Sequence, residues 1–191
     1  MSEAPAGATM GAVVDLYWLP LGAGGHSVRF NGLAFEAVAA RVQRRKRRDL
    51  YHSALVVDQH VIEMGPVWNP PAPERGVVCE GAGGSRLLGG LRLFRYEVRC
   101  WRGGRIPDVA EAVDSPQRLS DDPATARRIL ELVGTCPTPV WGARWNSNSL
   151  IAWLIAGSGI DPARARLPAG GRAPGWDAGI SGPYRIRHEQ E

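Results

Sequence analysis

Lysine and cysteine are scarce in this chain of 191 residues, and long apolar runs are missing. Of 23 basic residues only Lys46 is a lysine. Together with many alanines and glycines, this bias towards arginine is typical of a high-GC bacterial genome. No segment approaches the ~20 apolar residues of a membrane-spanning helix. The N-terminus has no basic region followed by an apolar run, so we expect no signal peptide and a cytoplasmic protein.

The three cysteines, Cys79, Cys100 and Cys136, are far apart and odd in number. This pattern argues against a disulfide framework and favours a reducing compartment. No CxxC spacing exists, so we expect no metal site, and nothing in the sequence indicates a cofactor. The apolar fraction of 44%, the charged fraction of 22% and the net charge of +4 are ordinary for a globular protein.

The length suits one domain with a sizeable core. We expect residues 1–11 to be disordered and residues 12–160 to form the domain. Residues 161–191 are rich in Pro, Gly and Arg, which predicts a wrapping or mobile tail. Hydrophobic patterns predict strands at 12–21, at 77–81, at 91–101 and on both sides of a turn near Asp58 and Gln59 within 51–65, and a helix at 33–48.

Two further helices are marked at their ends. In "SDDPATARRILELVG", Asp122 is a good N-cap, Pro123 suits the first turn and Gly134 suits the stop. In "RWNSNSLIAWLIAGSGI", a helix is predicted from Ser147 to Ala156. Its apolar residues surround it almost completely, which predicts that it is buried.

Ser147 lies at the predicted start of that helix, between Asn146 and Asn148. Free N–H groups and the helix dipole at this end stabilise an oxyanion, so Ser147 is a candidate nucleophile. A serine hydroxyl, however, needs an adjacent base. The alternative is that Asn146 or Ser147 is simply the helix cap, which is the more frequent role of such residues.

Of the four histidines, only His52 begins an apolar strand, where a rigid scaffold can orient it as a base. If the two strands within 51–65 pair, Glu63 on the second strand is expected near His52 and could orient it. His52 could equally be structural, and Glu63 an exposed strand residue.

The basic run "RVQRRKRR" ends the helix predicted at 33–48. A solvated helix end is the simplest interpretation, because cations are favoured there. A weak contact with an anionic surface is the alternative. The residues concerned are Arg44, Arg45, Lys46, Arg47 and Arg48.

Three segments in chain order, "VVDLYWLPL", "YHSALVV" and "WNSNSLIAWL", resemble the permuted papain-like superfamily. The closest resemblance is to the PPPDE, or DeSI-like, peptidases, with some likeness to the lecithin retinol acyltransferase-like group. The family's histidine segment is Y/W-H-[ST]-x-[VL]-x-V, and its nucleophile segment is N-C-N-x-F. By this resemblance His52 is the base and Ser147 stands where the family has its cysteine.

The resemblance implies an α+β fold in which an antiparallel sheet packs on the buried helix that starts at Ser147. It implies a hydrolase or acyltransferase acting on an amide, ester or thioester of a small molecule or peptide held in a cleft. Ser147 would attack, His52 would move the proton, Glu63 would orient His52, and Asn146 and Asn148 would hold the oxyanion. The alternative is a catalytically silent member of the fold that acts as a binding domain.

Overall fold

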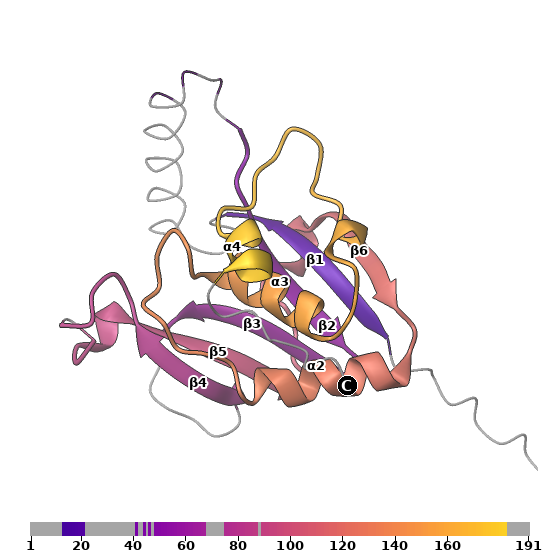
Figure 1. Ribbon diagram of the computed structural model, residues 1–191, viewed down its shortest axis with the longest axis horizontal. Coiled ribbons are helices and arrows are strands. Elements are labelled where there is room, and N and C mark those ends of the chain that lie inside the picture. Colours follow the sequence, from indigo (N-terminus) through magenta and orange to yellow (C-terminus); the bar gives the residue numbers. More distant parts are fainter. Residues whose placement is uncertain are drawn as a thin grey trace, which may run out of the picture.

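The computed structural model describes residues 13–21, 41, 44, 46, 48–67, 75–87 and 89–182. Its centre is a six-stranded sheet of order β4-β5-β3-β2-β1-β6 in which all neighbouring strands are antiparallel (Figure 1). The described part of the chain is therefore a mixed α+β structure, as expected. The strands are β1 (Val14–Pro20), β2 (Tyr51–Val57), β3 (His60–Pro66), β4 (Val77–Ala82), β5 (Arg95–Arg102) and β6 (Val113–Ser120).

The predicted hairpin within 51–65 is confirmed. β2 and β3 pair through Val57 and His60 around the turn at Asp58 and Gln59. Asp58 takes a φ of 56°, in the left-handed region that Asp tolerates better than most residues. The expected strands at 12–21, 77–81 and 91–101 correspond to β1, β4 and β5, although β5 begins later because Arg92–Phe94 form a 3-10 turn.

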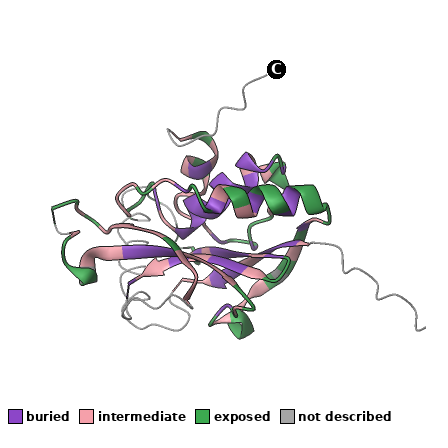
Figure 2. Ribbon diagram, turned by 90° about the horizontal axis from the view of Figure 1, so that it is seen from below, coloured by how far each residue is buried: buried purple, intermediate pink, exposed green. Residues whose placement is uncertain are grey.

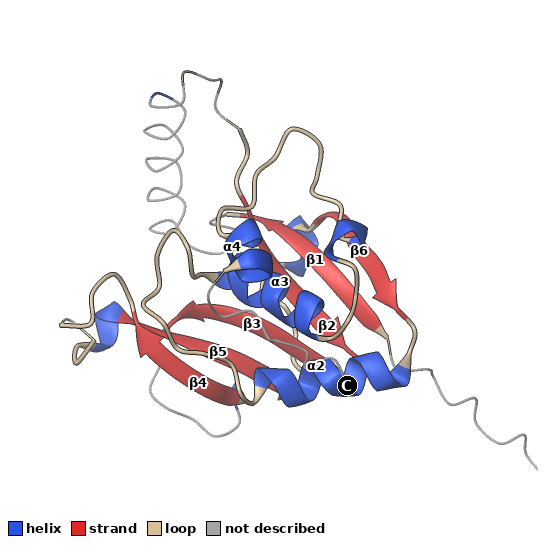
Figure 3. Ribbon diagram, in the orientation of Figure 1, coloured by secondary structure: helices blue, strands red, loops and turns tan. Residues whose placement is uncertain are grey.

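The helices α2 (Pro123–Val133), α3 (Ser147–Gly157) and α4 (Trp176–Ser181) lie on one face of the sheet, as Figures 2 and 3 show. The main core lies between this face and the helices. It includes Leu16, Leu55 and Ile62 from the sheet and Leu150 and Leu154 from α3. A smaller cluster of Leu19, Ala54, Val61 and Ile106 covers the opposite face. β2 is therefore buried on both faces.

The two helices predicted from signals at their ends, α2 and α3, form at the predicted positions. The Asp122 side chain accepts hydrogen bonds from the Ala124 and Thr125 amides, so it is the N-cap of α2. α3 is buried from Ser147 to Ile155, as the apolar pattern predicted. Trp153, for example, is only 4% exposed.

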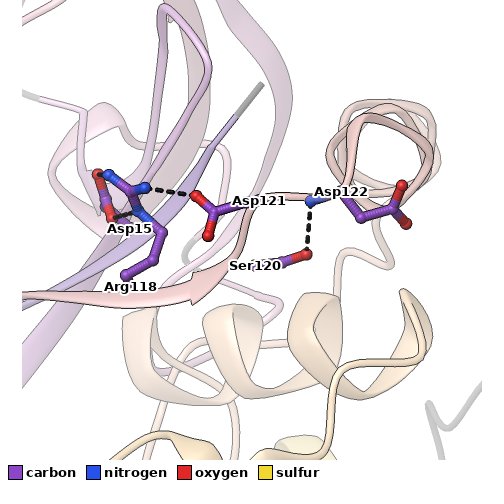
Figure 4. A network of polar contacts seen from close by, with 5 residues as sticks. All are labelled: Asp15, Arg118, Ser120, Asp121 and Asp122. Atoms are coloured by element: carbon purple, nitrogen blue, oxygen red, sulfur yellow. Dashed lines mark hydrogen bonds and ion pairs between the residues drawn. The ribbon is translucent and has the colours of Figure 1, made fainter. Parts of the chain in front are cut away.

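β6 was not predicted, because its sequence "VDSPQRLS" is polar and contains a proline. Such a strand is tolerated at a sheet edge, where β6 lies beside β1. Figure 4 shows the side chains that hold it: Arg118 contacts Asp15 of β1 and Asp121, and the Ser120 hydroxyl accepts from the Asp122 amide. This network joins the edge of the sheet to the start of α2.

The fold continues beyond residue 160, where the sequence suggested that a tail begins. α4 packs on α3, and the Trp176 ring lies 5.0 Å from that of Trp18 in β1. Residues 161–182 are thus part of the packed structure. The helix expected at 33–48 and the segment 1–11 lie almost wholly outside the described residues. Within the described residues, no helix has the length and apolarity needed to cross a membrane.

Candidate functional site

Asn146 is the cap of α3, which answers the question raised by the Asn-Ser-Asn segment. Its side-chain oxygen accepts hydrogen bonds from the Asn148 amide at 3.0 Å and the Ser149 amide at 3.4 Å. The Ser149 hydroxyl in turn accepts from the Asn146 amide at 2.6 Å, which completes a capping box. The capping alternative is therefore confirmed for Asn146, and Ser147 is the first residue of the helix.

Asn148 ties α3 to two other parts of the chain. Its side-chain nitrogen donates to the Tyr51 carbonyl at 2.9 Å and to the Pro174 carbonyl at 3.1 Å. Its side-chain oxygen accepts from the Ser53 hydroxyl at 2.9 Å. The amide thus uses both its N–H groups and its oxygen in holding α3 against β2 and against the segment before α4.

These bonds do not support Asn148 as a donor to an oxyanion. The Asn148 backbone N–H is bound by Asn146, and the Asn146 side chain also donates to the Gly142 carbonyl at 3.2 Å. An oxyanion hole needs donors that point at an open position beside the nucleophile. The Asn148 side-chain amide and backbone N–H are both engaged within the protein, so the recorded bonds of Asn148 leave it no donor for an oxyanion, and one N–H of Asn146 is used at Gly142.

His52 and Ser147 lie on opposite sides of the sheet. Side chains alternate along a strand, and the Ser53 hydroxyl contacts Asn148 on the α3 side. His52, one residue earlier, therefore points to the other face. Its cross-strand partner Leu19 belongs to the cluster on that face, which confirms the direction. The structure does not bring the expected base to the expected nucleophile.

The recorded partner of the Glu63 carboxylate, among the described residues, is Arg99 rather than His52. Glu63 is paired in register with Arg99 of β5, and their side chains form an ion pair. Arg99 also approaches Glu97, which forms a second ion pair with Arg75. Burial raises the pKa of Glu63, and the neighbouring Arg99 partly offsets this. Glu63 therefore belongs to a charge network on the face opposite α3, and its expected catalytic role is not supported.

Burial also changes the acidity of His52. It lowers the pKa of the imidazole to about 4, from an ordinary value of 6.5. The ring is neutral at pH 7 but is a weaker base than an ordinary histidine, which reduces its value for proton abstraction. Within the described residues, no group of three or more His, Cys, Asp or Glu side chains is placed to hold a metal ion.

Two clefts open beside the start of α3, and they share Ala143, Asp177 and Ala178. The smaller has a volume of about 500 Å³ and the larger about 960 Å³. These sizes are typical of small-molecule sites. Neither His52 nor Ser147 lines either cleft. Tryptophan and arginine side chains line both: Trp18, Trp176, Arg48 and Arg172 in the smaller, and Trp141, Trp145, Arg86 and Arg144 in the larger.

The Asn-Ser-Asn segment builds the smaller cleft indirectly. Pro174, whose carbonyl binds Asn148, lines that cleft together with Gly175. Gly175 takes a φ of 88°, and a Cβ there would lie 2.6 Å from the Asn146 side-chain nitrogen. Only glycine allows α4 to begin against the cap of α3 in this way. The main chain of Arg172, which lines the same cleft, is hydrogen-bonded to Asp49 and Tyr51.

The clefts are positively charged. Among the described residues that line them, each cleft has two arginines, and Asp177, which the clefts share, is the one acidic residue. Arg48, the last residue of the basic run, lines the smaller cleft; Arg44 and Lys46 are exposed, and Arg45 and Arg47 lie outside the described residues. The sequence signal for the other lining residues was weak, because Arg172 and Trp176 lie in the Pro/Gly-rich segment that was interpreted as a tail.

Comparisons of the chain with protein-family models, with curated proteins and with solved structures gave no match.

Proposed function

We propose that the protein is a non-catalytic binding domain for a small anionic ligand. The observation that carries this proposal is the placement of His52 and Ser147 on opposite faces of the sheet. A serine without a base within reach is a poor nucleophile. The hydrolase or acyltransferase activity implied by the resemblance is therefore the less favoured alternative.

The smaller cleft is the preferred binding site. Arg48 and Arg172 supply positive charge, and the Trp176 ring supplies an apolar wall. Arginine recognises carboxylate and phosphate groups through its planar fork of N–H donors. A ligand that carries an anionic group beside a flat apolar part matches this lining. Support for a built site comes from Asn148, which is held by Tyr51 and Ser53 of β2 and donates to the Pro174 carbonyl in the wall of this cleft.

Titration calorimetry with pyrophosphate and with adenosine diphosphate tests the binding proposal. We expect binding that weakens as salt is added, with the diphosphate nucleotide bound more tightly because its base can pack on Trp176. Arg48→Gln and Arg172→Gln should each weaken binding about tenfold or more. Arg144→Gln, which changes the larger cleft, is the matched control and should leave the affinity unchanged.

The opposite pattern, in which only Arg144→Gln weakens binding, would move the site to the larger cleft. Absence of binding for both pyrophosphate and adenosine diphosphate would end the proposal. Catalysis is tested separately with a broad fluorophosphonate probe. We expect no label at Ser147, and labelling there that depends on His52 would restore the hydrolase interpretation.

A further inference from the structure

Two of the three cysteines meet in the folded protein although 57 positions separate them in the chain. The Sγ atoms of Cys79, in β4, and Cys136, just after α2, are 2.6 Å apart. A disulfide bond is about 2.05 Å long, so a small movement is enough to join them. Both are free thiols in the structure.

The two thiols differ in exposure and in pKa. Cys136 is buried, at 8% exposure, whereas Cys79, on the edge strand β4, is only partly buried. The contact between the two sulfurs lowers the pKa of Cys79, and the same contact and burial raise the pKa of Cys136. Cys79 is the more exposed of the two sulfurs, so we expect its thiolate to attack first.

The segment that follows Cys136 forms a wall of the larger cleft. The Pro139 carbonyl accepts from the Tyr96 hydroxyl at 2.8 Å, and the Trp141 amide donates to the Ala82 carbonyl at 2.8 Å. Trp141 also packs edge-on against Tyr96, with ring centroids 5.9 Å apart. A bond at Cys136 would add a covalent tie between this wall and β4.

We propose that Cys79 and Cys136 are a reversible disulfide site that ties β4 to the wall of the larger cleft. The oxidant is a low-molecular-weight disulfide. The Cys79 thiolate attacks one of its sulfurs, forms a mixed disulfide and releases one thiolate. Cys136, on losing its proton, then attacks the Cys79 sulfur and releases the second thiolate. Two protein thiols are oxidised and one small disulfide is reduced to two thiols.

Cys100 is the internal control. It lies on β5, faces the same core as the pair, and its pKa is raised by burial. Neither of the other cysteines is recorded in contact with it among the described residues. The native fold should therefore select one of the three possible pairings, and Cys100 should remain a thiol.

The test treats the folded protein with excess oxidised glutathione and then digests it with trypsin without reduction. Cleavage after arginine isolates each cysteine, in peptides 76–86 (Cys79), 100–102 (Cys100) and 129–144 (Cys136). We expect peptides 76–86 and 129–144 to be joined and peptide 100–102 to be alkylated by iodoacetamide. The free thiol count should fall from three to one and return to three with dithiothreitol.

Variants separate closure of the disulfide from simple modification. Cys100→Ser should close as the wild type does. In the Cys136→Ser variant the reaction should stop at the mixed disulfide between glutathione and Cys79. In the Cys79→Ser variant Cys136 should stay unmodified in the folded state. The same oxidation in denaturing urea should scramble the pairings. A native cross-link that contains Cys100, or wild-type protein that stops with glutathione on Cys79, would overturn the proposal.

Discussion

Replacing Asn148 by alanine should destabilise the protein severely, because one side chain serves three partners. The change removes the hydrogen bonds to the Tyr51 carbonyl, the Pro174 carbonyl and the Ser53 hydroxyl. Ser53 is fully buried, and so is the contact with Tyr51. Each buried group left without a partner costs about 1–3 kcal/mol. Pro174 is half-buried, so its carbonyl oxygen can bind water instead, and the cost of losing this bond lies at the lower end of that range.

The expected loss is therefore about 3–5 kcal/mol, a large fraction of the ~5–15 kcal/mol that stabilises an ordinary domain. Urea denaturation followed by tryptophan fluorescence and by circular dichroism measures it, with agreement between the two signals as the check on two-state unfolding. If the variant is too unstable to purify, Ser53→Ala removes one of the three bonds and should cost about 1–2 kcal/mol.

Ser147→Ala is the matched control. It changes the neighbouring residue at the same helix end, and no hydrogen bond of the Ser147 hydroxyl is recorded among the described residues. We expect a change within about 0.5 kcal/mol. The reasoning is refuted if Asn148→Ala costs less than about 1 kcal/mol, or if Ser147→Ala costs as much as Asn148→Ala.

Three other predictions concern Ser147, His52 and Asp122. Ser147→Cys should react with iodoacetamide as an ordinary thiol of pKa ~8.5, and adding His52→Ala should not slow it; a slower reaction would indicate a working dyad. Because folding lowers the pKa of His52 to about 4, the unfolded state binds the extra proton first. The free energy of unfolding should therefore fall as pH falls from about 6.5 towards 4, and His52→Gln should flatten that fall, as measured by urea titrations at each pH. Asp122→Ala should cost about 1 kcal/mol through the lost cap, whereas Asp122→Asn should cost only a few tenths in the same assay.

The sequence alone predicted the elements whose signals are local. The cap at Asp122, the start of α3 at the Asn-Ser-Asn segment and the turn at Asp58 and Gln59 each depend on a few neighbouring residues, and all three were correct. The burial of α3 also followed from its own composition. The polar edge strand β6 was missed, because neighbours in space and not its own pattern hold it in the sheet.

The predicted pairing of His52 with Ser147 depended on which face of β2 His52 points to, and the local pattern does not determine that face. In "YHSALVV", Tyr51, Leu55 and Val57 alternate with Ala54 and Val56, so β2 is apolar on both faces. Alternation then fixes that His52 and Ser53 point in opposite directions, but it does not say which of them faces α3. Only the packing of α3 on the sheet decided this, through the bond between Ser53 and Asn148.

The sequence thus determined where the polar segment caps a helix, because capping depends on residues three apart in the chain. Tertiary structure alone decided what else that segment does. Asn148 reaches Ser53 and Pro174, and Cys79 reaches Cys136, across 95, 26 and 57 positions of sequence. Contacts at such separations depend on how the sheet and helices pack together, and no periodicity within a single segment records that packing.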